Sequence, residues 1–485
     1  MLKPTIGLEI HSELKTKTKM FCGCLNDPDE KHPNTNICPI CMAHPGTLPV
    51  ANQTAIESVV RVGLALNCEI AQFSKFDRKN YFYPDLPKGY QISQYDLPFC
   101  KRGYLKIGEN KINITRVHLE EDTARLQHDP KGNAALVDFN RAGVPLMELV
   151  TEPDIVSGKQ AREFAQELQL ILRYLGVSDA DMEKGQMRVE VNISLAKGGE
   201  RGTKVEIKNL NSLRSVEKSV DYEIRRQSEL IGEGKKINQE TRGWDESKQE
   251  TISQRSKEEA QDYRYFPEPD LPPVTFTQEQ IEKLKSTIPE LPQQKRTRFS
   301  KEYNLPENDI TVLVSDKELS GYFEDVVSEL LGWFKDENKK VSEEERLKAF
   351  KLTANYLISD LQSLLSAGGF LMKDLKITAE NFAEFIKLIF EGKITSRVAK
   401  DILAEMFNSG ADPSVLIEKG GLSQVSDETE LEKIIKDVIL QNPKPAEDYK
   451  KGKEESLQFL VGQVMKATKG KANPEKTASI LKNII

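Results

Sequence analysis

Residues 6–14 read Ile6-Gly7-Leu8-Glu9-Ile10-His11-Ser12-Glu13-Leu14, and this stretch decides how the rest of the chain is interpreted. The apolar residues fall on one parity, whereas Glu9, His11 and Glu13 fall on the other. This period of two predicts a strand whose successive side chains point to opposite faces. Two carboxylates and an imidazole on one face are costly to bury unless water, a metal ion or a substrate shares that face. A solvated outer face of an antiparallel sheet is the alternative.

The composition indicates a globular protein of several domains. A chain of 485 residues is too long to fold around a single hydrophobic core, so roughly two to four domains are expected. The sequence has no apolar run of about 18 residues and no charged-then-apolar leader. We therefore expect a cytoplasmic protein with neither a membrane span nor a secretion signal. Because the net charge is −7, any contact with nucleic acid must come from a local basic surface.

Four of the six cysteines form two close pairs that are separated by a loop of thirteen residues. Such pairs can wrap a tetrahedral Zn²⁺ with no open position, and the alternatives are disulfides or buried free thiols. A chain without a secretion signal favours the metal. His32 could replace one thiolate, although four sulfurs already complete the shell. We predict a structural zinc knuckle over residues 21–41 with four ligands: Cys22, Cys24, Cys38 and Cys41.

Later stretches carry polar groups that match those of the first strand. Residues 74–96 interleave cations with aromatic residues, which suits phosphate contact and stacking on a base, although a tyrosine-rich loop packed on a sheet gives the same pattern. Residues 112–122 and 136–150 predict further strands, and Glu148 lies alone among apolar neighbours, so it needs a partner. Two more alternating strands each place charged or polar residues on one face: Arg188, Glu190 and Asn192 in one, and Lys204, Glu206 and Lys208 in the other.

Amphipathic helices are predicted between these strands. One begins with Ser157 as N-cap, has Gln160 in a capping box and ends at Gly176, and a second runs from Ser212 to about Ile231. Strands with one polar face, and helices to cover the other, predict an α+β domain in which a curved antiparallel sheet cradles a metal ion and phosphates. No P-loop and no G-x-G-x-x-G motif occurs. A nucleotide would therefore be held by metal-bridging carboxylates and by Arg or Lys.

The second half of the chain shows a different pattern of residues from the first half. Six of the 23 prolines fall within residues 267–292 and indicate a domain boundary, beyond which the pattern is helical. From Gln463 to the end the chain carries five lysines and one acidic residue. This segment is either a solvated helix end or an RNA-binding surface, and three of its lysines are the candidates for RNA contact: Lys466, Lys469 and Lys471.

Several motifs, in order along the whole chain, resemble the B subunit of the tRNA-dependent amidotransferases, the GatB family. The N-terminal ones are Gly-Leu-Glu-Ile-His at 7–11, Phe-Asp-Arg-Lys-Asn-Tyr-Phe-Tyr-Pro-Asp at 76–85, His-Leu-Glu-Glu-Asp at 118–122 and Val-Asp-Phe-Asn-Arg-Ala-Gly-Val-Pro-Leu at 137–146. The others are Glu-Ile-Lys-Asn-Leu-Asn-Ser at 206–212, Asp-Tyr-Arg-Tyr-Phe-Pro-Glu-Pro-Asp at 262–270 and Phe-Leu-Val-Gly-Gln-Val-Met-Lys at 459–466.

The resemblance implies a glutamine-synthetase-like cradle domain over 1–292, an all-α domain over 293–405 and a YqeY-like, tRNA-binding tail over 406–485. It implies that ATP and Mg²⁺ activate the side-chain carboxylate of mischarged Glu-tRNA(Gln) or Asp-tRNA(Asn) as an acyl phosphate, which ammonia then converts to the amide. The ammonia would arrive by a tunnel from a partner amidase, the A subunit, and the small C subunit would complete a heterotrimer.

The same analogy identifies the site residues. The catalytic, magnesium-binding positions are Glu9, His11, Glu121 and Glu148. The residues of the polar stretches themselves, and not the analogy, supply the candidates for the nucleotide and its phosphates: Lys79, Lys88, Arg188, Glu190, Glu206, Lys208 and Arg264.

Two other functions stay open at this point. One is a non-catalytic, tRNA-binding zinc adaptor of a larger complex, and the other is a stand-alone ligase that joins ammonia to a small acid without tRNA. The chain has no obvious glutaminase, because Cys68 is expected in a core and Cys100 has no histidine beside it. This absence favours ammonia supplied by another polypeptide.

Overall fold

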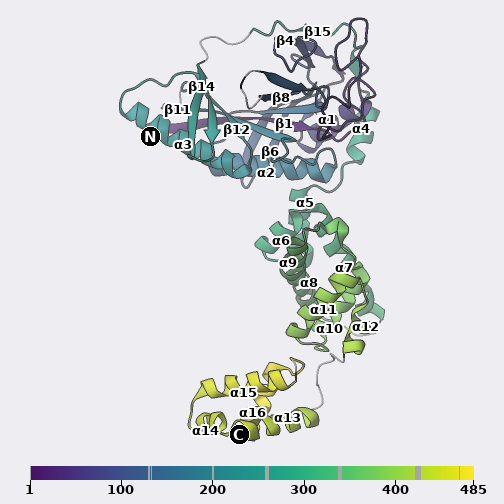
Figure 1. The fold of residues 1–485 in the computed structure, drawn as a ribbon, viewed down its shortest axis with the longest axis vertical. Coiled ribbons are helices and arrows are strands. Elements are labelled where there is room, and N and C mark those ends of the chain that lie inside the picture. The colour runs from purple at the N-terminus through teal and green to yellow at the C-terminus, as the bar shows by residue number, and fades with distance from the viewer. Residues whose placement is uncertain are drawn as a thin grey trace. The chain divides into compact units, whose positions relative to one another are not determined.

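The computed structural model describes residues 2–128, 132, 134–198, 201–256, 262–336, 341–420, 428–468 and 470–485. The chain forms two compact units, Met1–Pro292 and Gln293–Ile485 (Figure 1). The further boundary expected between residues 405 and 406 stays a prediction. Within the described ranges, no helix is both long and apolar enough to cross a membrane.

A large sheet organises the first unit. In the part of the chain that the structure describes, nine strands take the order β14-β13-β12-β11-β1-β10-β7-β6-β2. Their bounds are β1 Leu2–Glu13, β2 Glu69–Ile70, β6 Cys100–Ile107, β7 Asn110–Glu121, β10 Pro145–Thr151, β11 Met187–Lys197, β12 Val205–Leu210, β13 Glu240–Asp245 and β14 Glu250–Ser256. The strand predicted from residues 6–14 therefore lies in the middle, between β10 and β11.

The sheet is antiparallel except at one pair of strands. β12 and β13 are parallel, because helix α3 (Leu213–Gly232) provides the crossover that a parallel connection requires. The α+β class is confirmed, and the expectation of a purely antiparallel sheet is corrected at this pair.

Helices cover one face of the sheet. α1 (Gln53–Ala65), α2 (Gly158–Leu175) and α3 pack there, with α2 and α3 running below the strands in Figure 1. The alternating apolar residues of β1 supply the core, since Ile6, Leu8 and Ile10 are at most 1% exposed. Both predicted helices form, and each begins after a serine whose hydroxyl accepts a backbone N–H.

One detail of the helix prediction is wrong. The amide of Gln160 donates to Ser157 Oγ at 3.2 Å, but the Gln160 side chain accepts from Val156 N and not from the amide of the N-cap residue. The predicted capping box is therefore only half formed. The helix nevertheless ends as predicted, with Gly176 in the left-handed conformation at φ 69°.

Within the described residues three small sheets accompany the large one, and β4 (Asp77–Asn80), β15 (Phe266–Pro267) and β8 (Arg125–His128) lie on the side opposite α2 and α3 in Figure 1. In one of them β4 lies between β15 and β5 (Tyr90–Ser93). The other two pair β16 (Val274–Thr275) with β3 (Phe73–Ser74), and β8 with β9 (Ala135–Asp138). The proline-rich segment 267–292 thus packs on the first unit through β15, β16 and α4 (Gln278–Ser286). Glu268 in this segment is buried and accepts two hydrogen bonds from the Arg78 guanidinium, at 2.7 and 2.8 Å.

The second unit is built of helices, as predicted. Their bounds are α5 Pro292–Tyr303, α6 Glu307–Val314, α7 Lys317–Asp336, α8 Glu343–Asn355, α9 Gln362–Gly368, α10 Ala379–Phe390, α11 Ser396–Ser409, α12 Pro413–Gly420, α13 Glu428–Gln441, α14 Pro443–Lys450, α15 Glu454–Ala467 and α16 Pro474–Ile484. A π-helical turn, Tyr356–Leu361, joins α8 to α9, and a 3₁₀ turn covers Met372–Asp374. Helices α13 to α16 share a small core of their own around Ile435 and Leu460.

Candidate functional site

A row of cross-strand neighbours crosses the polar face of the sheet. His11 on β1 lies opposite Glu148 on β10 and opposite Arg188 on β11. Glu148 in turn lies opposite His118 on β7. Side chains directly opposite one another on one face have Cβ atoms only about 4.5–5.5 Å apart. Strand register therefore brings together groups that are far apart in the sequence.

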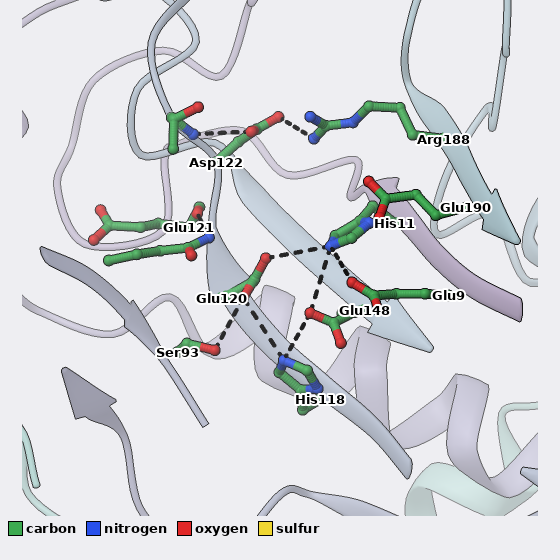
Figure 2. A network of polar contacts seen from close by, with 12 residues as sticks. Glu9, His11, Ser93, His118, Glu120, Glu121, Asp122, Glu148, Arg188 and Glu190 are labelled. Carbon is green, nitrogen blue, oxygen red and sulfur yellow. Dashed lines mark hydrogen bonds and ion pairs between the residues drawn. The ribbon is translucent and has the colours of Figure 1, made fainter. Parts of the chain in front are cut away.

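Five side chains of this polar face meet in one cluster (Figure 2). We call Glu9, His11, His118, Glu120 and Glu148 the carboxylate–histidine cluster. His11 Nε2 lies 3.4 Å from Glu148 Oε2, 3.8 Å from Glu120 Oε1 and 3.9 Å from Glu9 Oε1. His118 Nε2 lies 3.4 Å from the same Glu148 oxygen and 3.6 Å from Glu120 Oε2. The arrangement offers carboxylate oxygens and imidazole nitrogens to a common centre, which suits a divalent cation.

The charges in the cluster depend on one another. Burial alone would lower the pKa of His11, but the hydrogen bond and charge of Glu148, with the charge of Glu120, raise it to about 9. Burial opposes the ionisation of Glu148, yet His118 and His11 hold the pKa of its carboxyl well below the usual range. A divalent cation at this place would displace the proton of His11, so its affinity should rise with pH.

A cavity of about 950 Å³ lies over the cluster. Cations of its wall face the carboxylates: Lys79, Arg116, Arg188, Lys204 and Lys208. Burial opposes the charge of Lys79, but Glu120 and Glu148 outweigh it and raise the pKa of this lysine. Another part of the wall is aromatic, with Tyr95 and Tyr265 stacked at a centroid distance of 4.2 Å. The cavity can therefore hold an anionic ligand with a planar ring.

The cations on the β11 side of the cavity are held in place by carboxylates. Arg188 Nη2 donates to Asp122 Oδ2 at 2.7 Å, and Lys208 Nζ lies 2.9 Å from Glu190 and 3.7 Å from Glu206. Burial opposes the ionisation of Asp122, but Arg188 and a second arginine lower its pKa. All four residues that the sequence suggested here (Arg188, Glu190, Glu206 and Lys208) line the same cavity as Lys79.

The structure does not bring Glu121 to the cluster. Side chains alternate at the end of β7, so His118 and Glu120 face the cavity whereas Leu119 and Glu121 point to the opposite face. Glu121 accepts from Lys88 Nζ at 2.8 Å and from Ile92 N at 2.9 Å. With Lys88 it lines a separate cavity of about 280 Å³ beside the cysteines. The expected convergence of Glu121 is therefore wrong, and Glu120 takes its place.

Two of the residues expected to contact the nucleotide do not line the large cavity, and their role stays a prediction. Lys88 is the partner of Glu121 and lies outside the large cavity. Arg264 is exposed and left-handed at φ 44°, and among the described residues it is its neighbours Tyr263 and Tyr265 that line the cavity. The two tyrosines flank Arg264 in the sequence, and aromatic residues beside a cation were the signal that could have identified them.

The four cysteines lie together as one group. Their sulfur atoms are within 4.8 Å of one another, and the sulfurs of Cys38 and Cys41 are 3.9 Å apart. Four thiolates around a tetrahedral Zn²⁺ would be separated by about 3.8 Å, whereas a disulfide bond measures about 2.05 Å. None of the four is in a disulfide. This cluster could bind a metal ion without His32, which is exposed and pairs with Glu30 at 3.0 Å.

The lysines suggested for RNA contact lie near the end of α15. Lys466 is exposed in its last turn, and Lys471 is partly buried in the following connection to α16. Lys469 lies outside the described residues. Their role in RNA binding stays a prediction.

Comparison with known proteins bears on both units. Residues 4–282 match the GatB/GatE catalytic domain, and residues 325–485 match the GatB domain. The chain belongs to the GatB family. Proteins named as the B subunit of aspartyl/glutamyl-tRNA(Asn/Gln) amidotransferase are similar to it over nearly their full length. One from Thermoanaerobacter sp. (strain X514) is 49% identical over 483 residues, which is 98% of each chain. One from Thermotoga sp. (strain RQ2) is 47% identical over 493 residues, which is 100% of this chain and 99% of that protein.

The family prediction made from the motifs is thus confirmed, and so is the prediction of an enzyme of the ligase type. GatB-family proteins act in tRNA-dependent amidation, and their designation as B subunits indicates an assembly of several subunits.

Proposed function

We propose that this chain uses ATP and Mg²⁺ to activate the side-chain carboxylate of Glu-tRNA(Gln), Asp-tRNA(Asn) or both as an acyl phosphate. Ammonia then displaces the phosphate and gives Gln-tRNA(Gln) or Asn-tRNA(Asn) for protein synthesis in the cytoplasm. The observation that carries this proposal is the cavity in which the carboxylate–histidine cluster faces several cations. A nucleotide site without a P-loop needs this combination, because phosphoryl transfer depends on positioning and on compensation of charge.

The donor set of the cluster fits Mg²⁺. Carboxylate oxygens are the ligands that this ion prefers, and Glu9, Glu120 and Glu148 supply them beside His11. Mg²⁺ bound by these residues would neutralise the charge that develops on the transferred phosphoryl group. Arg116 lies on β7, Arg188 on β11, Lys208 on β12 and Lys79 on β4, so phosphates in the cavity would meet positive charge from several elements.

Ammonia would come from a partner glutaminase (amidase), the A subunit, with the small C subunit completing the assembly. The cysteines outside the four-cysteine group support this division of labour. Cys68 and Cys100 are both buried, and burial raises the pKa of Cys68 to about 12 and the pKa of Cys100 well above its ordinary value. Neither has the exposed thiolate that a glutaminase nucleophile requires.

We assign a structural Zn²⁺ to the group of Cys22, Cys24, Cys38 and Cys41, and tRNA binding to the tail over residues 406–485. The sulfur geometry supports the first assignment, and the exposure of Lys466 supports the second.

The decisive assay measures ADP release and amide formation by the purified assembly, with ammonium salt in place of glutamine. Mischarged tRNA should stimulate ADP release, whereas the same tRNA carrying its correct amino acid should not. A non-catalytic adaptor would bind the tRNA without releasing ADP, and a stand-alone ligase would turn over a free amino acid, so either result would refute the proposal.

A further inference from the structure

The segment 137–146, one of the motifs that carry the family resemblance, packs on the residues that follow β7. The peptide groups of Asp122 exchange two hydrogen bonds with this segment, at 2.9 and 2.8 Å. The arginine of the segment, Arg141, donates from Nε to Thr123 O at 3.0 Å and from Nη2 to Ala124 O at 3.1 Å. The segment therefore fixes the backbone that carries Asp122.

Both oxygens of the Asp122 carboxylate are engaged, and the residue is only 4% exposed. Oδ1 accepts from the amide of Thr123 at 2.8 Å, whereas Oδ2 accepts from Arg188 Nη2 at 2.7 Å and lies 3.6 Å from Arg141 Nε. Two arginines thus share one negative charge. Asp122 can therefore orient Arg188 while a net positive charge remains at this edge of the cavity.

Arg188 and Asp122 point toward one another beside the carboxylate–histidine cluster (Figure 2). Arg188 starts on β11, opposite His11, whereas Asp122 follows the end of β7, and β1 and β10 lie between these two strands. An arginine side chain has many rotamers, and a ligand that must order it loses affinity. The contact with Asp122 orders this side chain before a ligand binds.

The guanidinium of Arg188 keeps donors for such a ligand. It carries five N–H donors, and among the described residues Asp122 is the one acceptor of a hydrogen bond from it. Its Nε has no partner among those residues. The side chain is 37% exposed and lines the large cavity. A planar fork with free donors matches the paired oxygens of a carboxylate or a phosphate.

We infer that Asp122, fixed by Arg141, is a positioning residue that holds the guanidinium of Arg188 where it binds an oxyanion of the reacting groups. The inference rests on the proposed function and deepens it. The oxyanion belongs either to a phosphate of the nucleotide or to the side-chain carboxylate of the substrate, since both present paired oxygens to the same fork. An ion pair that only ties β11 to the end of β7 has the same contacts, but its loss would affect stability and not the reaction.

The test is a double-mutant cycle on Asp122 and Arg188. ADP release by the full assembly is measured at saturating ammonium, against the concentration of ATP and against that of mischarged tRNA. Asp122→Asn keeps the shape of the side chain but removes its charge, so kcat/KM should fall by about 10- to 100-fold, as for loss of a hydrogen bond to a charged group. Arg188→Gln should lower kcat/KM at least as far, and Arg141→Gln by a smaller factor.

The double variant separates positioning from stability. Because Asp122 acts through Arg188, adding Asp122→Asn to Arg188→Gln should lower kcat/KM by less than about twofold. A higher KM for ATP alone would identify a nucleotide phosphate as the anion that Arg188 binds. A higher KM for the mischarged tRNA alone would identify the substrate carboxylate.

Glu223→Gln is the matched control, because Glu223 is also a buried carboxylate that binds two arginines. It lies on α3, 2.8 Å from Arg226 and 3.1 Å from Arg242, and it does not line the large cavity. This variant should melt at a lower temperature and keep its kcat/KM.

If Asp122→Asn does not fold, Asp122→Glu keeps the charge but moves it by one methylene group, and its effect on kcat/KM should likewise vanish in the Arg188→Gln background. An unchanged kcat/KM in the variant that folds, or an effect of full size in the Arg188→Gln background, would overturn the inference. ADP release by the wild type would then leave the proposed function in place. Absence of ADP release in the wild type would count against both.

Discussion

Glu120 and Glu121 are neighbours in the sequence, but their carboxylates lie on opposite faces of β7. The same isosteric change can therefore be made on either face of one strand. Glu120→Gln keeps the shape of the side chain but removes a charge that faces both His11, at 3.8 Å, and His118, at 3.6 Å. Glu121→Gln removes a charge from the other face, where its partner is Lys88 at 2.8 Å.

The structure predicts that only one of the two changes, Glu120→Gln, removes a charge on which the reaction depends. Loss of a carboxylate that holds a cation costs several kcal/mol of transition-state stabilisation, and about 3–4 kcal/mol corresponds to a rate lower by roughly 10²- to 10³-fold. Glu121→Gln leaves the ammonium of Lys88 without its counter-ion in a site where the two side chains are 15% and 5% exposed. Breaking such a pair costs about 3 kcal/mol of unfolding free energy, while the cavity over the cluster keeps all its charges.

The assay is ADP release with mischarged tRNA at saturating ammonium, and thermal unfolding of each variant is measured in parallel. Both variants should melt lower, because Glu120 and Glu121 are each buried beside a basic partner. Only Glu120→Gln should lose the reaction, whereas Glu121→Gln should still release ADP below its melting temperature. Loss of ADP release in a folded Glu121→Gln protein, together with near wild-type release in Glu120→Gln, would refute the assignment of faces on β7.

Three further predictions concern other parts of the chain. Cys38→Ser should reduce zinc from about one per chain and lower the melting temperature, whereas full zinc retention would exclude Cys38 as a ligand. Burial and a neighbouring carboxylate raise the pKa of Glu13 from 4.5 to about 8. Between these two pH values the folded state keeps the proton that the unfolded state loses, so the unfolding free energy should fall as the pH rises from 4.5 to 8. Glu13→Gln should flatten this fall, and urea titrations of both proteins at several pH values measure it. Lys466→Glu combined with Lys471→Glu should weaken tRNA binding and its dependence on salt, whereas Lys106→Glu, on an exposed position of β6, should change neither.

The sequence predicted the structure correctly where the spacing of apolar residues along a short segment indicates which side chains are buried. The alternation in residues 6–14 predicted the central strand, and Ser157 and Gly176 predicted where α2 begins and ends. It also predicted that Glu148 needs a partner, because a carboxylate in an otherwise apolar strand cannot be left alone. The partners themselves, His11 and His118, depend on which strands pair, and that information is not local.

The exchange of Glu121 for Glu120 has a specific structural cause. Ile112 and Ile114 are buried in the core, and extending their alternation along β7 would put Glu120 in the core and Glu121 on the polar face. Val117 and Leu119 are also buried, so the strand changes parity between residues 114 and 117. The register with β10 shifts at this point, where Val150 pairs with Arg116 but Thr151 pairs with Ile114. An irregularity of one residue reverses every side chain beyond it. The apolar residues Val117 and Leu119 already show the new parity in the sequence, so the local pattern favoured Glu120 for the polar face, whereas the family analogy selected Glu121.

The core face of the sheet also determines the geometry of the site. On β10, Met147 and Leu149 are fully buried, while Glu148 between them points to the cavity. A slip of β10 by one residue against β1 would place an apolar side chain in the row with His11 and turn Glu148 into the core, where an unpaired carboxylate costs several kcal/mol. The apolar residues that pack below the sheet therefore hold the register that aligns His11, Glu148 and His118 above it. It follows that a cavity-creating change such as Met147→Ala should lower cation affinity as well as stability, although Met147 touches the opposite face.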